Sequence, residues 1–126
     1  IIKCRNINDY TNNSGEIILD GLYQPHSPFF YNDIFAICDS RNCSIKFYNA
    51  TTFKLLNTYK TNGFTRGLYI DNDKIYVGIS SSIFHKSNED FENIDCSIEI
   101  IDFKTYKKIK NISIPSNEIY SIKKLN

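Results

Sequence analysis

The stretch that decides the fold is Gly63-Phe-Thr-Arg-Gly-Leu-Tyr-Ile-Asp-Asn-Asp-Lys-Ile-Tyr-Val-Gly-Ile-Ser80. From Ile75 to Ile79, every second residue is a β-branched aliphatic, which is the period of a strand that packs one face against protein. Leu68 to Ile70 belongs to a shorter extended run, and the acidic and amide side chains of residues 71–73 suit a tight turn with left-handed backbone. The stretch therefore predicts two antiparallel strands joined by a tight turn.

The chain repeats this hairpin and follows each copy with a second pair of extended runs. Upstream, Phe29 to Tyr31 and Ile34 to Asp39 flank a short Asn-Asp turn. The segment from Cys43 to Lys54 recurs as Cys96 to Lys107 at a constant offset, with matching Cys, Ser, Ile, Thr, aromatic and Lys positions. Each unit is therefore predicted to hold four short strands.

Two whole units account for most of the chain, at about residues 25–62 and 65–114, and a third opens at 117. A unit of roughly 40 to 50 residues with four short strands is typical of a β-propeller blade. We therefore expect an all-β protein, a partial β-propeller of about two four-stranded antiparallel blades with fragments at both ends. Residues 1–126 are expected to form one domain.

Equivalent positions in the two units predict equivalent packing. Ile45 and Phe47 correspond to Ile98 and Ile100, and we expect all four to be buried between sheets that pack face to face. A propeller closes with about four or more blades, so two units leave apolar faces uncovered. We expect them to associate with the remaining blades of a longer chain or with one another.

Length, composition and charge narrow the function classes. The chain has 126 residues and is 41% hydrophobic, which suffices for one domain with a core. Fifteen basic and fourteen acidic residues give a net charge of +1, which argues against a nucleic-acid partner. No run approaches the roughly 18 apolar residues of a membrane helix. We expect a cytoplasmic protein without a membrane partner, a removed leader being the alternative.

The four cysteines, Cys4, Cys38, Cys43 and Cys96, lack the paired spacing of a zinc site. We expect reduced structural thiols and no metal or cofactor. A disulfide between Cys38 and Cys43 across a turn is the alternative.

Two local features complete the pattern. An insertion from Ser80 to Asp95 separates the second and third strands of the second unit, either as a functional loop or as a tolerated surface insertion. Pro25 and Pro28 stand at the start of the first unit, before its first strand pair, and each is expected to hold the residue before it in an extended conformation.

Three motifs stand before successive strand pairs: Pro25-His-Ser-Pro28, Gly63-Phe-Thr-Arg-Gly-Leu68 and Glu118-Ile-Tyr120. Their order and spacing resemble a group of uncharacterised, mainly bacterial proteins with propeller-like repeats. The resemblance spans roughly residues 21 to 125, and it implies a propeller fold and kinship without an established activity.

A second resemblance is confined to Phe64-Thr-Arg-Gly-Leu68, which is similar to the Phe-Thr-Xaa-Gly-Leu motif of the propeller-type glutaminyl cyclases. Arg66 stands where that family usually has Gln. This resemblance implies an enzyme as one possible function class.

Superposing the repeats predicts a ligand-binding site at His26, Arg66 and Glu118, which fall at or within one residue of the same place. The first strand of a propeller blade is innermost, so these side chains would surround the channel mouth. A histidine, an arginine fork and a carboxylate suit a small anionic ligand. The alternative is that they pair with one another and satisfy buried polar groups.

These features predict a binding or scaffold module whose ligand is a small anion or a protein partner. The alternative is an enzyme of lyase, cyclase or hydrolase type that acts on a small polar or anionic molecule at the channel mouth. Fold alone does not choose between them.

Overall fold

The computed structural model describes residues 2–3, 16–81 and 95–125. The described part of the chain is all-β, with one 3-10 turn at Ser40–Asn42 and no α-helix. Within it, no helix is long and apolar enough to span a membrane. The strands are β1 (Ile2–Lys3), β2 (Glu16–Ile17), β3 (Pro25–Tyr31), β4 (Ile34–Asp39), β5 (Ser44–Asn49), β6 (Leu55–Lys60), β7 (Phe64–Asp71), β8 (Lys74–Ser80), β9 (Ser97–Asp102) and β10 (Lys108–Ser113).

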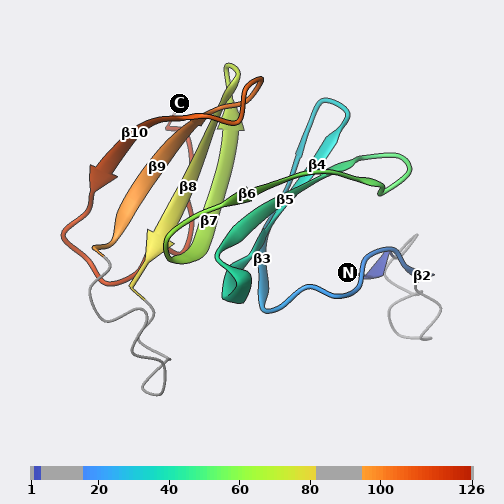
Figure 1. Ribbon diagram of the computed structural model, residues 1–126, viewed down its shortest axis with the longest axis horizontal. Coiled ribbons are helices and arrows are strands. Elements are labelled where there is room, and N and C mark those ends of the chain that lie inside the picture. Colours follow the sequence, from blue (N-terminus) through green and yellow to red (C-terminus); the bar gives the residue numbers. More distant parts are fainter. Residues whose placement is uncertain (1, 4–15, 82–94, 126) are drawn as a thin grey trace.

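Two four-stranded antiparallel meanders make up the body of the protein (Figure 1). The first sheet has the order β3-β4-β5-β6, and the second has the order β7-β8-β9-β10. Figure 1 shows the sheets as two neighbouring layers, with β7 the strand of the second sheet that contacts β3, β4 and β5. The predicted all-β fold with two four-stranded antiparallel units is confirmed.

The hairpin that decides the fold forms as β7 and β8. Asp71 pairs with Lys74, and the two residues between them, Asn72 and Asp73, both have positive φ, at 49° and 57°. This is the left-handed backbone that Asn and Asp tolerate in two-residue hairpin turns. β7 begins at Phe64, four residues before the apolar run from Leu68, because its first residues pair with β8 across a bulge.

The prediction for the residues before the prolines is wrong. Gln24 and Ser27 have φ of 50° and 53°, in the left-handed region. Ser27 lies in a bulge between β3 and β4, where its hydroxyl accepts the Gly67 N–H at 3.0 Å. The bulge and this contact with the next unit outweigh the local preference for extended backbone.

The core lies between the two sheets. It is built from β-branched, aromatic and small side chains of both meanders, which alternate with residues on the opposite faces. Its buried members are Ala36, Cys38, Ile45, Phe47, Leu68, Ile70, Ile75, Val77 and Ile101. The first sheet has a second, smaller apolar layer on its other face, formed by Leu19, Phe35, Ile37 and Tyr48. The first sheet thus buries apolar side chains on both of its faces.

The burial prediction holds for the first sheet and fails for the second. Ile45 and Phe47 are fully buried, whereas Ile98 and Ile100 are only partly buried. Their neighbour Ile101 lies in the core between the sheets instead. By register, Ile98 and Ile100 lie on the face of β9 that points away from the first sheet, and no third sheet of the described chain covers that face.

The third unit begins without forming a strand, since residues 114–125 have no strand pairing. The segment nevertheless attaches to the second sheet as β7 attaches to the first. At the first junction the carbonyl of Thr65 accepts the Ser40 hydroxyl, and two residues later the Gly67 N–H is donated to Ser27. Two serine hydroxyls of one unit therefore hold the start of the next.

The second junction has the same pattern. The carbonyl of Asn117 accepts the Ser81 hydroxyl, and two residues later the Ile119 N–H is donated to Ser80. Ile119 is buried over Gly78, where an added Cβ would lie 2.7 Å from its side chain. The opening of a third unit at 117 is therefore visible as a repeated junction, although not as a strand.

Cys38, Cys43 and Cys96 are free thiols, so the alternative of a Cys38–Cys43 disulfide is wrong. Burial raises the pKa of Cys38 to about 12, against a smaller lowering by its hydrogen bond with Thr65. A thiol with such a pKa is unreactive near neutral pH. Cys4 and the interior of the predicted insertion from Ser80 to Asp95 lie outside the described residues.

Candidate functional site

Arg66 and Glu118, predicted from equivalent positions of the second and third units, form an ion pair. Arg66 lies in the bulge of β7, between the paired residues Thr65 and Leu68, and donates from one guanidinium nitrogen to Glu118 Oε1 at 3.2 Å. The guanidinium carbon lies 4.0 Å from the ring centroid of Tyr120, within cation–π range. The arginine is thus held by a carboxylate and by an aromatic face, both from the segment that follows β10.

His26, the third predicted residue, binds a different partner. Its Nδ1 lies 2.9 Å from Ser40 Oγ, and the Ser40 hydroxyl donates to the Thr65 carbonyl at 2.6 Å. Because a serine hydroxyl has one proton, Ser40 must accept from His26, which fixes the proton of the neutral imidazole on Nδ1. Nε2 is then the basic nitrogen. The ring packs edge-on against Phe64, with 5.7 Å between centroids.

The three predicted residues are coupled electrostatically. Burial lowers the pKa of His26, and the positive charge of Arg66 lowers it further. A hydrogen bond with the Gln24 backbone and the negative charge of Glu118 act in the opposite direction without cancelling these effects. At neutral pH the imidazole is therefore uncharged beside an arginine–carboxylate pair.

The structure thus joins Arg66 to Glu118 directly and leaves His26 near them but bonded to Ser40. Sequence reasoning missed Ser40 and Tyr120 as parts of this cluster. Tyr120 could have been found, because it follows Glu118 by two residues within a quoted motif and extended backbone places i and i+2 on one side. Ser40 offers no such signal, since it meets His26 only through the β3–β4 pairing.

A shallow groove of about 520 Å³ lies beside the ion pair, on the side of the second sheet that faces away from the first. Its apolar lining comes from β9 and from the segment after β10, and its polar lining includes Glu118 and Tyr120. The apolar residues are Ile98, Ile114, Ile119 and Ile122. Of the three predicted site residues, Glu118 is the one that lines this groove.

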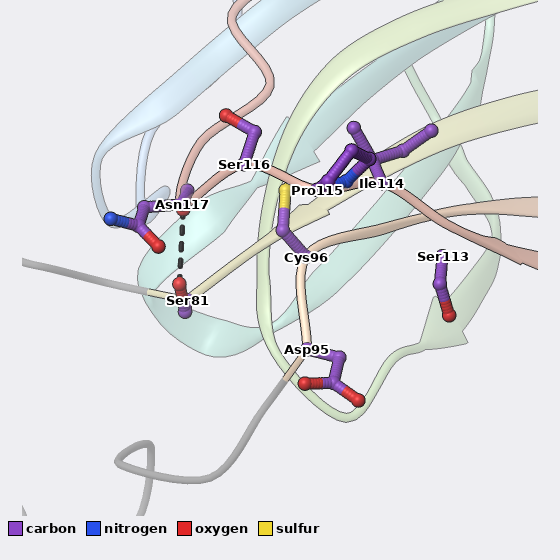
Figure 2. A pocket seen from close by; sticks show the side chains of 8 residues that line it. All are labelled: Ser81, Asp95, Cys96, Ser113, Ile114, Pro115, Ser116 and Asn117. Carbon is purple, nitrogen blue, oxygen red and sulfur yellow. Dashed lines mark hydrogen bonds between the residues drawn. The ribbon is translucent and has the colours of Figure 1, made fainter.

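A second hollow, of about 540 Å³, lies at the end of the second sheet where β8 ends and β9 begins. Figure 2 shows Ser81 and Asn117 closing one side of it through their hydrogen bond, with Cys96, Asp95 and Ser113 around it. Burial raises the pKa of Cys96, and the charge of Glu118 raises it further. This hollow therefore offers hydroxyls and a carboxylate but no activated thiolate.

A separate polar cluster connects the two sheets. The Glu99 side chain on β9 is 3% exposed, accepts the Tyr59 hydroxyl from β6 and pairs with Lys108 Nζ at 3.0 Å. Burial raises the pKa of Tyr59, and its bond to Glu99 and the charge of that carboxylate raise it further. Because every partner is satisfied, this cluster reads as a structural contact between sheets.

No group of three or more His, Cys, Asp or Glu side chains in the described ranges is arranged to hold an ion.

Comparison with known proteins gives a family without an assigned chemistry. No curated protein matches the chain. One family model, described as "Domain of unknown function (DUF4915)", matches residues 10–126, which include all three quoted motifs and every residue of the ion pair and its surroundings. The chain belongs to the DUF4915 family.

Proposed function

We propose that the two sheets are successive blades of a β-propeller and that the protein is a binding module for a small anionic ligand. Two features support the propeller arrangement: the meander order within each sheet and the serine junction that recurs between units. Successive propeller blades are four-stranded sheets of this kind.

The observation that carries the binding site is the Arg66 guanidinium, fixed by Glu118 and stacked against Tyr120 at the start of a repeat unit. An arginine has five N–H donors in a planar fork, and the hydrogen bond to Glu118 uses one nitrogen. A carboxylate or phosphate oxygen of a small ligand is the acceptor that matches the rest of this fork. A neutral His26 adds a hydrogen-bonding group without adding charge.

The test uses inorganic phosphate and malonate as probes. Each is titrated into the protein while the NMR signals of the Arg66 side chain are followed, and we expect saturable shifts for at least one probe. Arg66→Gln should abolish the binding while the melting temperature stays nearly unchanged. Arg41→Gln, which alters an arginine of the 3-10 turn, is the matched control and should bind as wild type does.

Two results would contradict the binding site. One is the absence of saturable shifts with either probe in the wild-type protein. The other is a loss of stability in Arg66→Gln as large as that expected for a buried ion pair, about 3 kcal/mol, which would assign the pair a structural role.

The enzyme alternative rests on one observation, the basic Nε2 of His26 that follows from the Nδ1 contact with Ser40. A neutral imidazole near a guanidinium can accept a proton from a bound polar molecule. The same NMR samples separate the two functions. A probe anion that stays chemically unchanged in the presence of protein supports the binding module, and time-dependent conversion that His26→Gln removes supports an enzyme.

A further inference from the structure

We propose that this chain associates with a second copy of itself head to tail, the open face of one second sheet covering the outer face of the partner's first sheet. Here the open face is the side of the second sheet formed by Ile98, Ile100 and Ile112. The outer face is the side of the first sheet that carries Phe30 and Leu55. This inference is independent of the anion site.

The contact between the two sheets within one chain shows what such an interface contains. On the first sheet, Ile45 and Phe47 are fully buried against the second sheet. On the second sheet, Ile70 is buried against the first. Each of these positions has a counterpart in the other unit. The counterparts of Ile45 and Phe47 lie on the open face, and the counterpart of Ile70 lies on the outer face.

The counterparts at the C-terminal end lie on the open face. By strand register, Ile98 corresponds to Ile45, since each pairs with the fifth residue of the preceding strand. Ile100 corresponds to Phe47 in the same way, and both isoleucines are partly exposed. Ile112, which pairs with Ile98, is 38% exposed.

The groove beside β9 shows how this face is incomplete. Ile98 and Ile119 line it together, and Ile119 already occupies the position of the first strand of a third sheet through its bond to Ser80. At the first junction the equivalent space is filled by the side chains of β8, among them Val77. The groove is therefore the space where a further hairpin of the same kind would insert its side chains.

The counterparts at the N-terminal end lie on the outer face. Phe30 corresponds to Ile70, because each pairs with the second residue of the following strand in its hairpin. Ile70 is 2% exposed, whereas Phe30 is 62% exposed and stacks on Phe35 at 4.8 Å between centroids. Leu55 pairs with Tyr48 on this face and is also exposed.

On the outer face, Phe35 and Ile37 are already buried in the chain's own layer with Leu19 and Tyr48, so Phe30 and Leu55 are the part of this face that is exposed. The exposed parts of the two faces therefore repeat positions of an interface that the chain already makes internally. A contact between different patches of two identical chains is heterologous, and it closes into a ring when the rotation allows. Contiguous exposed apolar surface on a sheet face is typical of an interface. A second copy supplies the missing half at each end, so we commit to it as the occupant of the open face.

The experiment is a complementation test by sedimentation velocity. The wild-type chain should show an average mass that rises with concentration. Phe30→Asp places a charge on the outer face, and Ile98→Asp places one on the open face. In either variant every copy lacks one of the two faces that the contact needs, so each variant alone should be monomeric. Mixed in equal amounts, the two variants should form a heterodimer through the one intact face that each retains. Leu125→Asp is the control. It places the same charge on an exposed leucine outside the two faces, and this variant should associate as wild type does.

Three outcomes would overturn the proposal. The first is a wild-type chain that stays monomeric across the dilution series. The second is a Phe30→Asp variant that still dimerises while Ile98→Asp does not, which would show a symmetric contact between two open faces. The third is a pair of folded, monomeric variants that fail to combine. Circular dichroism confirms that each variant folds, and Phe30→Ser and Ile98→Ser replace any variant that does not.

Discussion

At the scale of single residues, buried charged side chains of this protein are held by partners from neighbouring segments. Asp39 shows how. Burial alone would raise its pKa, but hydrogen bonds from Asn42, Lys46 and the Tyr23 backbone outweigh burial and lower it. A buried carboxylate is tolerated when its oxygens are paired in this way. Glu99 and His26 are also held by hydrogen-bond partners, and each leads to a measurable prediction.

The contact between Tyr59 and Glu99 crosses from one sheet to the other. We expect a double-mutant cycle of Tyr59→Phe and Glu99→Gln to give a coupling energy of about 2 kcal/mol, because hydrogen bonds to charged groups contribute about that much. Urea unfolding of the four proteins measures it. Tyr59→Phe combined with Asp102→Asn, a half-buried carboxylate at the end of the same strand, should be additive. A coupling energy near zero for Glu99 would contradict the contact.

The lowered pKa of His26 makes the stability of the fold depend on pH in a definite direction. A folded-state pKa below the unfolded value means that the unfolded chain binds the proton more tightly. The stabilisation is therefore present above about pH 6.5, the ordinary histidine pKa, and is lost as the pH falls through the folded value. NMR titration should place the His26 midpoint below that of an ordinary histidine, and Arg66→Gln should raise it by removing a positive neighbour. A midpoint at or above the ordinary value would contradict the assigned environment.

At the scale of elements, the hairpin of residues 63–80 could be predicted because alternation and turn chemistry agree within one short stretch. The left-handed turn at Asn72 and Asp73 needed no information from the rest of the chain. The backbone at Ser27 could not be predicted, because its bulge exists to meet Gly67 of the next unit. The ion pair of Arg66 with Glu118 was accessible only through the repeat, since residues so far apart in sequence share no local signal.

The junction with the third unit depends on a glycine in β8. An added Cβ at Gly78 would lie 2.1 Å from the Arg66 carbonyl oxygen and 2.7 Å from the Ile119 side chain. Because the backbone oxygen cannot move aside without breaking the hairpin, Gly78→Ala should cost about 3 kcal/mol. Gly21→Ala is the control, since nothing lies within 4 Å of its Cβ position and only its φ of +63° opposes the change. That variant should lose about 1 kcal/mol, and equal losses would contradict the close approach.

At the scale of the whole molecule, the two sheets are layers of a stack that could continue at both ends. Sequence reasoning found the layers but assigned the interior of the second one to the wrong face. Repeat equivalence is correct for position within a unit and says nothing about whether a neighbour is present. Ile98 and Ile100 occupy the positions of Ile45 and Phe47, yet burial follows from the sheet that lies opposite, and here that sheet is missing from the described chain.

Two neighbouring isoleucines of β9 lie on opposite faces of the second sheet, and this difference leads to a prediction. Ile101 is fully buried between the sheets, so Ile101→Asp places a carboxylate in the core and should cost about 4 kcal/mol or more. Ile100 points to the open face, where a carboxylate stays partly hydrated, and Ile100→Asp should cost no more than about 1 kcal/mol. Urea unfolding at a concentration where the wild-type chain is monomeric measures both, which keeps association from adding to the apparent stability. Because the substitutions are identical and adjacent in one strand, differences in β propensity cancel, and only the face decides the result. A larger loss for Ile100→Asp than for Ile101→Asp would reverse the facing of β9 and, with it, remove the open face on which the head-to-tail contact depends.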